Sequence, residues 1–179
     1  MDWIFDGGRR CLDFVNTLRD RYTSGREQLT DPALLAEWLV AAGHAERRHR
    51  VTAEELALAR ELREAIDRLA RGETKAADVR LVNQMAAELP VPQLQIHADG
   101  PQRVLRFSQG PVRAILAELA TDAIDLVASN GLVRICASDT CGVRFVDASP
   151  KHNRQWCSMA RCGNRAKARA HYARRKSST

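Results

Sequence analysis

Two short stretches near the C-terminal end decide the fold of this chain. They read RICASDTCG over residues 134–142 and WCSMARCGNR over residues 156–165. Four residues separate the cysteines within each pair, and fifteen lie between the two pairs. Short cysteine pairs that bracket a loop of this length are typical of a structural zinc site with four sulfur ligands. We therefore predict one structural Zn²⁺ ion held by Cys136, Cys141, Cys157 and Cys162.

The residues around the cysteines predict how the ligands are presented. Apolar residues before the first pair and after it, including Ile135 and Phe145, favour a β-hairpin whose turn carries that pair. The second pair lies five positions apart, which is about 140° on a helix. Both sulfurs cannot then reach one ion from within a regular helix, so we place Cys157 just before the first turn and Cys162 inside it. A hairpin followed by a helix start in this way is treble-clef-like.

Two other readings of the cysteines are two disulfides and four free buried thiols. The chain has no apolar run near 18 residues, and its first ten residues lack the apolar stretch of a signal peptide. We therefore expect a cytoplasmic protein without a membrane span, in which thiols stay reduced. His152 lies between the pairs and is an alternative ligand, but four sulfurs already fill a tetrahedral site.

Positive charge is concentrated at the same end of the chain. Residues 131–179 contain eleven Lys and Arg against two acidic residues, a net charge of +9. The rest of the chain has seventeen basic and twenty acidic residues, a net charge of −3. Such segregation implies a polyanionic partner, either nucleic acid or an acidic membrane surface.

A basic helix follows the second cysteine pair, because residues 158–176 are rich in Ala, Arg and Lys and contain no acidic residue. The helix lacks the bulky apolar face that insertion into a membrane interface needs, which favours nucleic acid. We expect Arg165 and Arg169 to contact base edges, and Lys167, Arg174 and Lys176 to contact phosphate. The full predicted nucleic-acid-binding set is Arg154, Arg161, Arg165, Lys167, Arg169, Arg174, Arg175 and Lys176.

The remainder of the chain reads as a helical body. Asp31-Pro32 and Thr52 with Glu55 are signals of helix starts, and Gly43 and Gly72 are signals of helix ends. We expect helices over residues 9–21, 32–42, 53–71, 74–88 and 111–129, with a β-hairpin around Asp99-Gly100. The predicted fold class is mainly α with one β-hairpin (α+β). A helical N-terminal domain, residues 1–130, precedes a small C-terminal treble-clef-like zinc finger, residues 131–179.

Both parts resemble known families. The run from Trp156 to Lys167, with Cys162-Gly163-Asn164-Arg165 at its centre, resembles the CGNR zinc-finger family. The run from Leu12 to Thr17, with Asp31-Pro32, Trp38-Leu39 and Gly43, resembles the ABATE domain that accompanies that finger. The resemblance implies a bacterial transcription regulator, a family for which RNA binding is sometimes proposed.

The predicted function is a zinc-dependent nucleic-acid-binding protein, a DNA-binding transcription regulator with an N-terminal sensor domain. An RNA-binding accessory protein and a zinc-stabilised protein-interaction module stay open. Asp13 and Asn16 are polar residues in an apolar helix, so they are candidates for a pocket that takes a small-molecule effector, or they bond to nearby backbone. We expect no enzyme, since no GxSxG, Walker or HExxH motif occurs. Cys11 reads as a buried structural thiol or a redox sensor, and homodimer formation stays open.

Overall fold

The computed structural model describes residues 2–129 and 131–169. A helical body is followed by a small finger, which confirms the predicted mainly helical α+β class. The elements, in chain order, are α1 (Arg10–Val15), β1 (Leu18–Arg19), β2 (Arg26–Glu27), α2 (Pro32–Ala41), α3 (Ala53–Ala70), α4 (Ala76–Ala86), β3 (Val91–His97), β4 (Gly100–Arg106), α5 (Pro111–Ala128), β5 (Val133–Ile135), β6 (Arg144–Val146) and the π-helical turn η1 (Met159–Gly163). An α-helix continues from η1 over residues 164–169.

The predicted helix starts are present in the body. The Asp31 carboxylate accepts hydrogen bonds from the first two free N–H groups of α2, at 2.9 and 3.1 Å. Thr52 and Glu55 form the predicted capping box at the start of α3. At the other end of α3, Gly72 has a positive φ of 84°. This conformation, which favours glycine, lets the backbone turn out of the helix.

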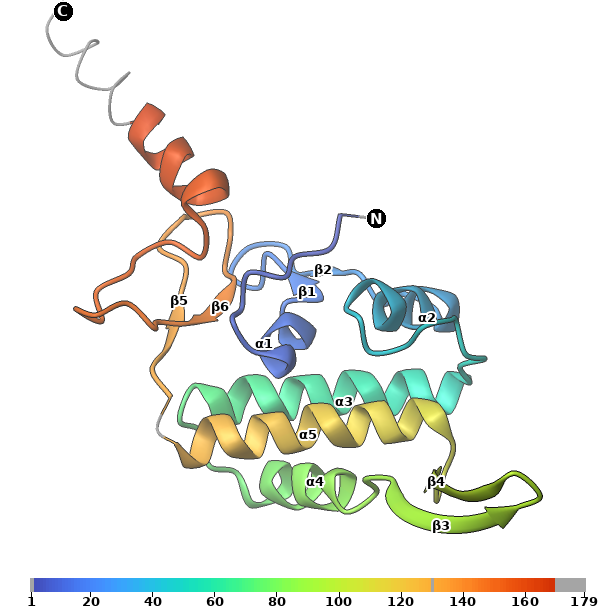
Figure 1. Cartoon of the computed structure of the whole chain (residues 1–179). Helices are drawn as coiled ribbons and strands as arrows, with labels where there is room; N and C mark the ends of the chain where they lie inside the picture. Colours follow the sequence, from blue (N-terminus) through green and yellow to red (C-terminus); the bar gives the residue numbers. More distant parts are fainter. Residues whose placement is uncertain (1, 130, 170–179) are drawn as a thin grey trace, which may run out of the picture.

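The core lies between a layer of three helices and two shorter helices that cover it. Helices α3, α4 and α5 run side by side, and α1 packs across α3 and α5 (Figure 1). The largest buried side chains include Phe14 and Trp38, whose ring centroids are 5.3 Å apart. Because α1 brings Leu12, Phe14 and Val15 into this core, it is held firmly on the three-helix layer.

Helix α1 is much shorter than predicted, because it ends at Val15 instead of Arg21. The reason is that Asn16 uses its side chain in a strand-like contact with the finger. Its Nδ2 donates to the Arg144 carbonyl at 2.9 Å, and its Oδ1 accepts from the Arg144 N–H at 2.8 Å. The chain then turns into the short pair β1–β2, which the sequence did not predict.

The predicted hairpin is present as β3–β4, paired from Val91 opposite Arg106 to His97 opposite Gly100. The two residues of its loop are Ala98 and Asp99, one position before the predicted turn. This hairpin projects from the helical layer at the end opposite the finger (Figure 1). Within the described residues, no helix is long and apolar enough to cross a membrane.

The Asn16 contact generates a stability prediction. Asn16→Ala leaves the buried N–H and carbonyl of Arg144 without partners, and we expect a loss of about 1–3 kcal/mol in the free energy of unfolding. Urea denaturation of the zinc-loaded protein measures it. The matched control is Asn83→Ala on the exposed face of α4. If both variants lose the same stability, the contact does not hold the finger to the body.

Candidate metal centre and nucleic-acid interface

The first cysteine pair lies in the turn of the finger hairpin, as predicted. Strands β5 and β6 pair antiparallel from Val133 opposite Val146 to Ile135 opposite Arg144. One further bond, from the Cys136 N–H to the Val143 carbonyl at 2.9 Å, extends the pairing to the first ligand. Gly142 follows Cys141 with φ of 63°, and its N-terminal neighbours close a tight turn. The hairpin thus brings the thiols of Cys136 and Cys141 together at its turn.

The second pair lies at the start of the C-terminal helix, also as predicted. Cys157 precedes the helix, and Cys162 lies inside its first turn. That turn is π-helical instead of α-helical, because the Gly163 N–H reaches back to the Ser158 carbonyl at 3.1 Å. A side chain at Gly163 would meet the Met159 sulfur at 2.5 Å. The wide turn and the missing side chain together let the helix start close to the metal site.

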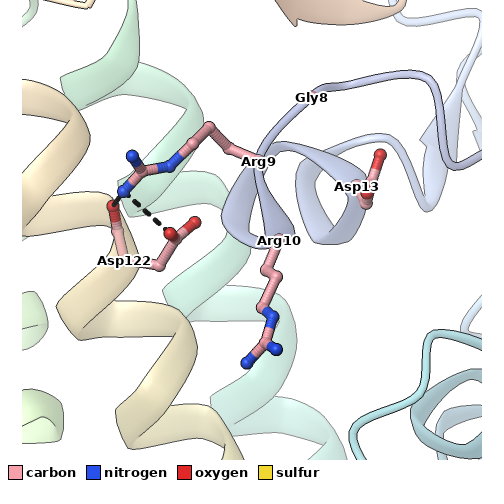
Figure 2. Close-up of a pocket in the computed structure, with 5 residues that line it drawn as sticks. All are labelled: Gly8, Arg9, Arg10, Asp13 and Asp122. Atoms are coloured by element: carbon pink, nitrogen blue, oxygen red, sulfur yellow. Dashed lines mark hydrogen bonds and ion pairs between the residues drawn. The ribbon is translucent and has the colours of Figure 1, made fainter.

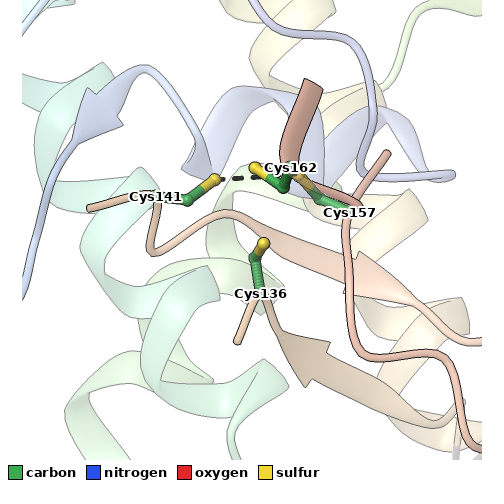
Figure 3. A group of neighbouring side chains, drawn as sticks. All are labelled: Cys136, Cys141, Cys157 and Cys162. Carbon is green, nitrogen blue, oxygen red and sulfur yellow. Dashed lines mark hydrogen bonds between the residues drawn. The ribbon is translucent and has the colours of Figure 1, made fainter. Parts of the chain in front are cut away.

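The four sulfur atoms fit a tetrahedral zinc ion. All four Sγ atoms lie within 4.8 Å of one another and are buried (Figure 3). The sulfurs of Cys141 and Cys157 are 3.7 Å apart, and those of Cys157 and Cys162 are 3.8 Å apart. A tetrahedron with Zn–S bonds of 2.3 Å has edges of about 3.8 Å. No disulfide joins the cysteines. The four cysteines therefore form a site for one metal ion, as predicted.

Hydrogen bonds and burial shift the pKa values of three of the four thiols. The hydrogen bond from Cys157 lowers the pKa of Cys141 to about 5, although burial opposes this. The same hydrogen bond, and then burial, raises the pKa of Cys157, and burial raises the pKa of Cys136. A divalent cation supplies the charge that lets all four ionise, and zinc in such a closed site is structural.

Asp147 organises the loop between the two cysteine pairs, a role that the sequence did not reveal. Its carboxylate accepts from the Ser149 N–H at 3.0 Å, the Ser149 hydroxyl at 2.6 Å and the Arg154 N–H at 2.9 Å. It also pairs with Arg134 at 2.8 Å. Burial raises the pKa of Asp147, but these hydrogen bonds and the Arg134 charge outweigh it and hold the pKa at about 2. His152 lies outside the cysteine cluster, with its Nδ1 3.1 Å from the Asp147 carbonyl.

Arg144 joins the finger to the body. Its guanidinium is almost fully buried and pairs with Asp67 of α3, with Nε 2.6 Å from Oδ1. It also donates to the Gly142 carbonyl at 2.5 Å and lies 5.1 Å from the centroid of the Tyr22 ring. An arginine in a strand of a zinc hairpin looks like one more nucleic-acid contact in the sequence. Only its burial against Asp67 of α3 identifies Arg144 as part of the contact between the finger and the body.

The N-terminal segment adds a second connection between the body and the finger. Ile4 is buried in the same cluster as the four cysteines. The Val146 N–H donates to the Gly7 carbonyl at 2.9 Å. Asp6 pairs with Arg161 of η1 at 3.3 Å. The finger therefore packs between α1 and the first residues of the chain.

The structure divides the predicted nucleic-acid residues into two groups. Three of them serve the finger itself. Arg154 donates to the carbonyls of Trp156 and Cys157, Arg161 pairs with Asp6, and Arg165 donates to the Cys162 sulfur at 3.4 Å. Lys167 is exposed, and Arg169 makes one long ion pair with Asp139 at 3.7 Å. Arg174, Arg175 and Lys176 lie outside the described residues.

The two polar residues of α1 lie in different surroundings. Asp13 lines an open hollow of about 480 Å³ with Gly8, Arg9, Arg10 and Asp122 (Figure 2). Burial raises the pKa of Asp13 to about 6, although the Gly7 N–H that it accepts lowers it. Asn16 does not line this hollow, since its amide is bonded to Arg144. The effector pocket thus stays a prediction for Asp13 alone.

Cys11 of α1 is fully buried beside Asp122. Burial and the hydrogen bond to that carboxylate raise the pKa of the Cys11 thiol. The thiolate is the form that oxidants attack, so this thiol has the character of a structural residue.

The sulfur geometry predicts one zinc ion per chain, bound tetrahedrally at about 2.3 Å. Metal analysis and X-ray absorption of the purified protein measure this. Cys162→Ser should lose most of the zinc, because three sulfurs and a hydroxyl are a poorer donor set. Cys11→Ser, the matched control outside the cluster, should keep it. A zinc-free protein with two disulfides by thiol titration would contradict the assignment.

The role of Asp147 generates a separate prediction. Asp147→Asn keeps the shape of the side chain but removes the charge that holds Arg134 and two N–H groups. We expect zinc to pass to a chelator on the order of tenfold faster, as for other residues that support a metal site from outside. Asp139→Asn, an exposed acid in the same finger, is the control. Equal transfer rates for both variants would show that the loop holds its shape without Asp147.

Comparison with known families agrees with this geometry. The ABATE family, described as "Putative stress-induced transcription regulator", matches residues 8–130, and the CGNR zinc finger matches residues 133–175. No curated protein matches the sequence. Since the first match covers well over half of the chain, the chain belongs to the ABATE family and carries a CGNR zinc finger behind that domain.

Proposed function

We propose that the protein is a zinc-dependent, DNA-binding transcription regulator in which the helical body regulates the finger. The observation that carries this is the segregation of charge, +9 over residues 131–179 against −3 elsewhere. Basic residues held on one small rigid module attract the phosphate backbone.

The C-terminal helix is the proposed contact surface. It starts at the metal site and leads away from the body (Figure 1), so a nucleic acid can approach it without meeting the acidic helices. Lys151, Lys167 and Arg169 are exposed cations of the finger and its helix. Arg174, Arg175 and Lys176 follow in the sequence. Zinc, in this proposal, fixes where the helix begins and therefore where its cations lie.

The regulatory role of the body rests on its contacts with the finger. The hollow beside Asp13 is one hydrogen bond away from Gly7, and Gly7 accepts from Val146 of β6. A small molecule that contacts Asp13 would therefore act, through the Asp13–Gly7 hydrogen bond, on Gly7, which is bonded to the finger. Such a ligand changes the position of the finger only if the contact between Gly7 and Val146 has two arrangements and the ligand binds them with different affinity.

The proposal predicts strong salt dependence of binding. Some five or six cations of the finger and the residues after it should contact phosphates at once, so log K should fall against log salt with a slope of roughly −4 to −6 on duplex DNA. Titrations on a DNA duplex and on an RNA hairpin at several salt concentrations measure this. Tighter binding to the hairpin would favour an RNA-binding accessory protein. A slope near zero on both would favour a protein-interaction module.

Matched variants separate base reading from phosphate contact. Lys167→Gln should weaken binding to all sequences alike and make the slope shallower by about one unit. Arg169→Gln should weaken a selected sequence more than a random one, by roughly 1–3 kcal/mol. Arg80→Gln, an exposed arginine of α4, removes the same charge from the body and should change neither. If Arg80→Gln weakens nucleic-acid binding as much as Lys167→Gln does, the contact surface is not confined to the finger.

A further inference from the structure

The hairpin β3–β4 exposes apolar side chains that nothing in the described chain covers. All seven residues of β3 are exposed, and Val91, Leu94 and Ile96 expose 60%, 72% and 75% of their surface. Leu105 and Phe107, on β4 and just after it, are also exposed. A two-stranded hairpin that packs on nothing is marginally stable in water. Contiguous exposed apolar residues of this kind mark an interaction surface.

The two edges of the hairpin differ in charge. Strand β3 reads VPQLQIH and contains no charged residue, whereas β4 reads GPQRVLR and contains Arg103 and Arg106. Natural proteins usually protect a free strand edge with charged side chains, which oppose pairing with another strand. Strand β4 has this protection. Strand β3 has only Pro92, near its start, so most of its edge is open.

We propose that β3 is a self-association strand, which pairs antiparallel with β3 of a second copy across a two-fold axis at Gln95. The result is a four-stranded sheet that spans both chains. This surface goes beyond nucleic-acid binding and does not depend on it.

The sequence of β3 fits a second copy of itself. In antiparallel pairing about a centre at Gln95, the middle of one strand meets the middle of the other. Leu94 of each copy then lies opposite Ile96 of the second copy, and both lie on one face because alternate residues share a face. On the opposite face, Gln95 meets Gln95 of the second copy and Gln93 meets His97. No charged pair arises, and Leu94 and Ile96 each gain an apolar neighbour.

The charges of the hairpin exclude the other edge. Two β4 strands centred on Arg103 would place like charges opposite each other, which is destabilising. Within the described residues, Arg103 and Arg106 make no ion pair that would neutralise them. Pairing through β3 leaves both arginines on the outer edges of the four-stranded sheet, in water.

The place of the hairpin makes this dimer compatible with the rest of the molecule. The hairpin and the finger lie at opposite ends of the helical layer (Figure 1). Pairing through β3 therefore leaves both zinc fingers free. The contact is one strand wide, well under the area of a standard interface, so we expect weak association, with a Kd of roughly 10–500 µM.

Sedimentation equilibrium of the zinc-loaded protein, without nucleic acid, tests the proposal. The average mass should rise from 20.0 kDa toward twice that value as concentration increases. Leu94→Lys and Ile96→Lys should each weaken association at least tenfold, since they add like charge and remove apolar contact on the paired edge. Both side chains are exposed, so the melting temperature of the dilute protein should not change. Amide hydrogen exchange of β3 should slow at high concentration.

Leu105→Lys is the matched control, because it adds the same charge to an exposed apolar position of β4. It should leave association unchanged. If Leu105→Lys dissociates the dimer as strongly as Leu94→Lys, the hairpins pack face to face and the edge pairing is wrong. A wild-type protein that stays monomeric up to about 500 µM, the upper end of the Kd range expected for this contact, would overturn the proposal.

Discussion

The buried ion pair between Arg144 and Asp67 is the constraint on which the arrangement of body and finger depends. Both side chains are almost fully buried, at 3% and 5% exposure. Removing one partner of such a pair leaves an uncompensated buried charge, at a cost of about 3–5 kcal/mol. The pair tolerates burial because Gly142 and Arg71 supply further polar contacts. The finger therefore cannot leave α3 without exposing this pair to water and losing its contacts.

The Arg144–Asp67 pair links two parts of the chain, the helical body and the finger, that differ in what stabilises them. The body has its own apolar core, whereas the finger has a small cluster of cysteines with Ile4, Val143 and Phe145. So small a core needs the metal. The metal also aligns β6, and β6 presents Arg144 to Asp67. Zinc binding and docking of the finger should therefore support each other.

Local sequence signals predicted the parts of this protein that depend on near neighbours. Cysteine spacing identified the metal ligands, and Asp31 and Thr52 identified helix starts. Contacts between distant segments escaped prediction. Asn16 read as a helix residue because its partner, Arg144, lies 128 positions away. Asp147 gave no signal either, since an isolated acid in a basic loop resembles any surface residue. Charge patterns show that cations are present but not which of them are already paired.

The division of the cations bears on the nucleic-acid binding that we propose for the finger. Arg154 and Arg165 donate to carbonyl and sulfur atoms at the metal site, so Nε and Nη2 of each guanidinium are in use before any ligand arrives. A carbonyl does not neutralise the charge of Arg154, which still contributes positive potential, whereas the charge of Arg165 is partly offset by the Cys162 sulfur that it contacts. These two arginines are poorly placed to read bases, however, since N–H donors that are already bonded within the finger cannot also bond to a base edge. In the proposed function, the residues near the zinc site therefore attract the phosphate backbone, and any reading of sequence is assigned to residues beyond Arg165.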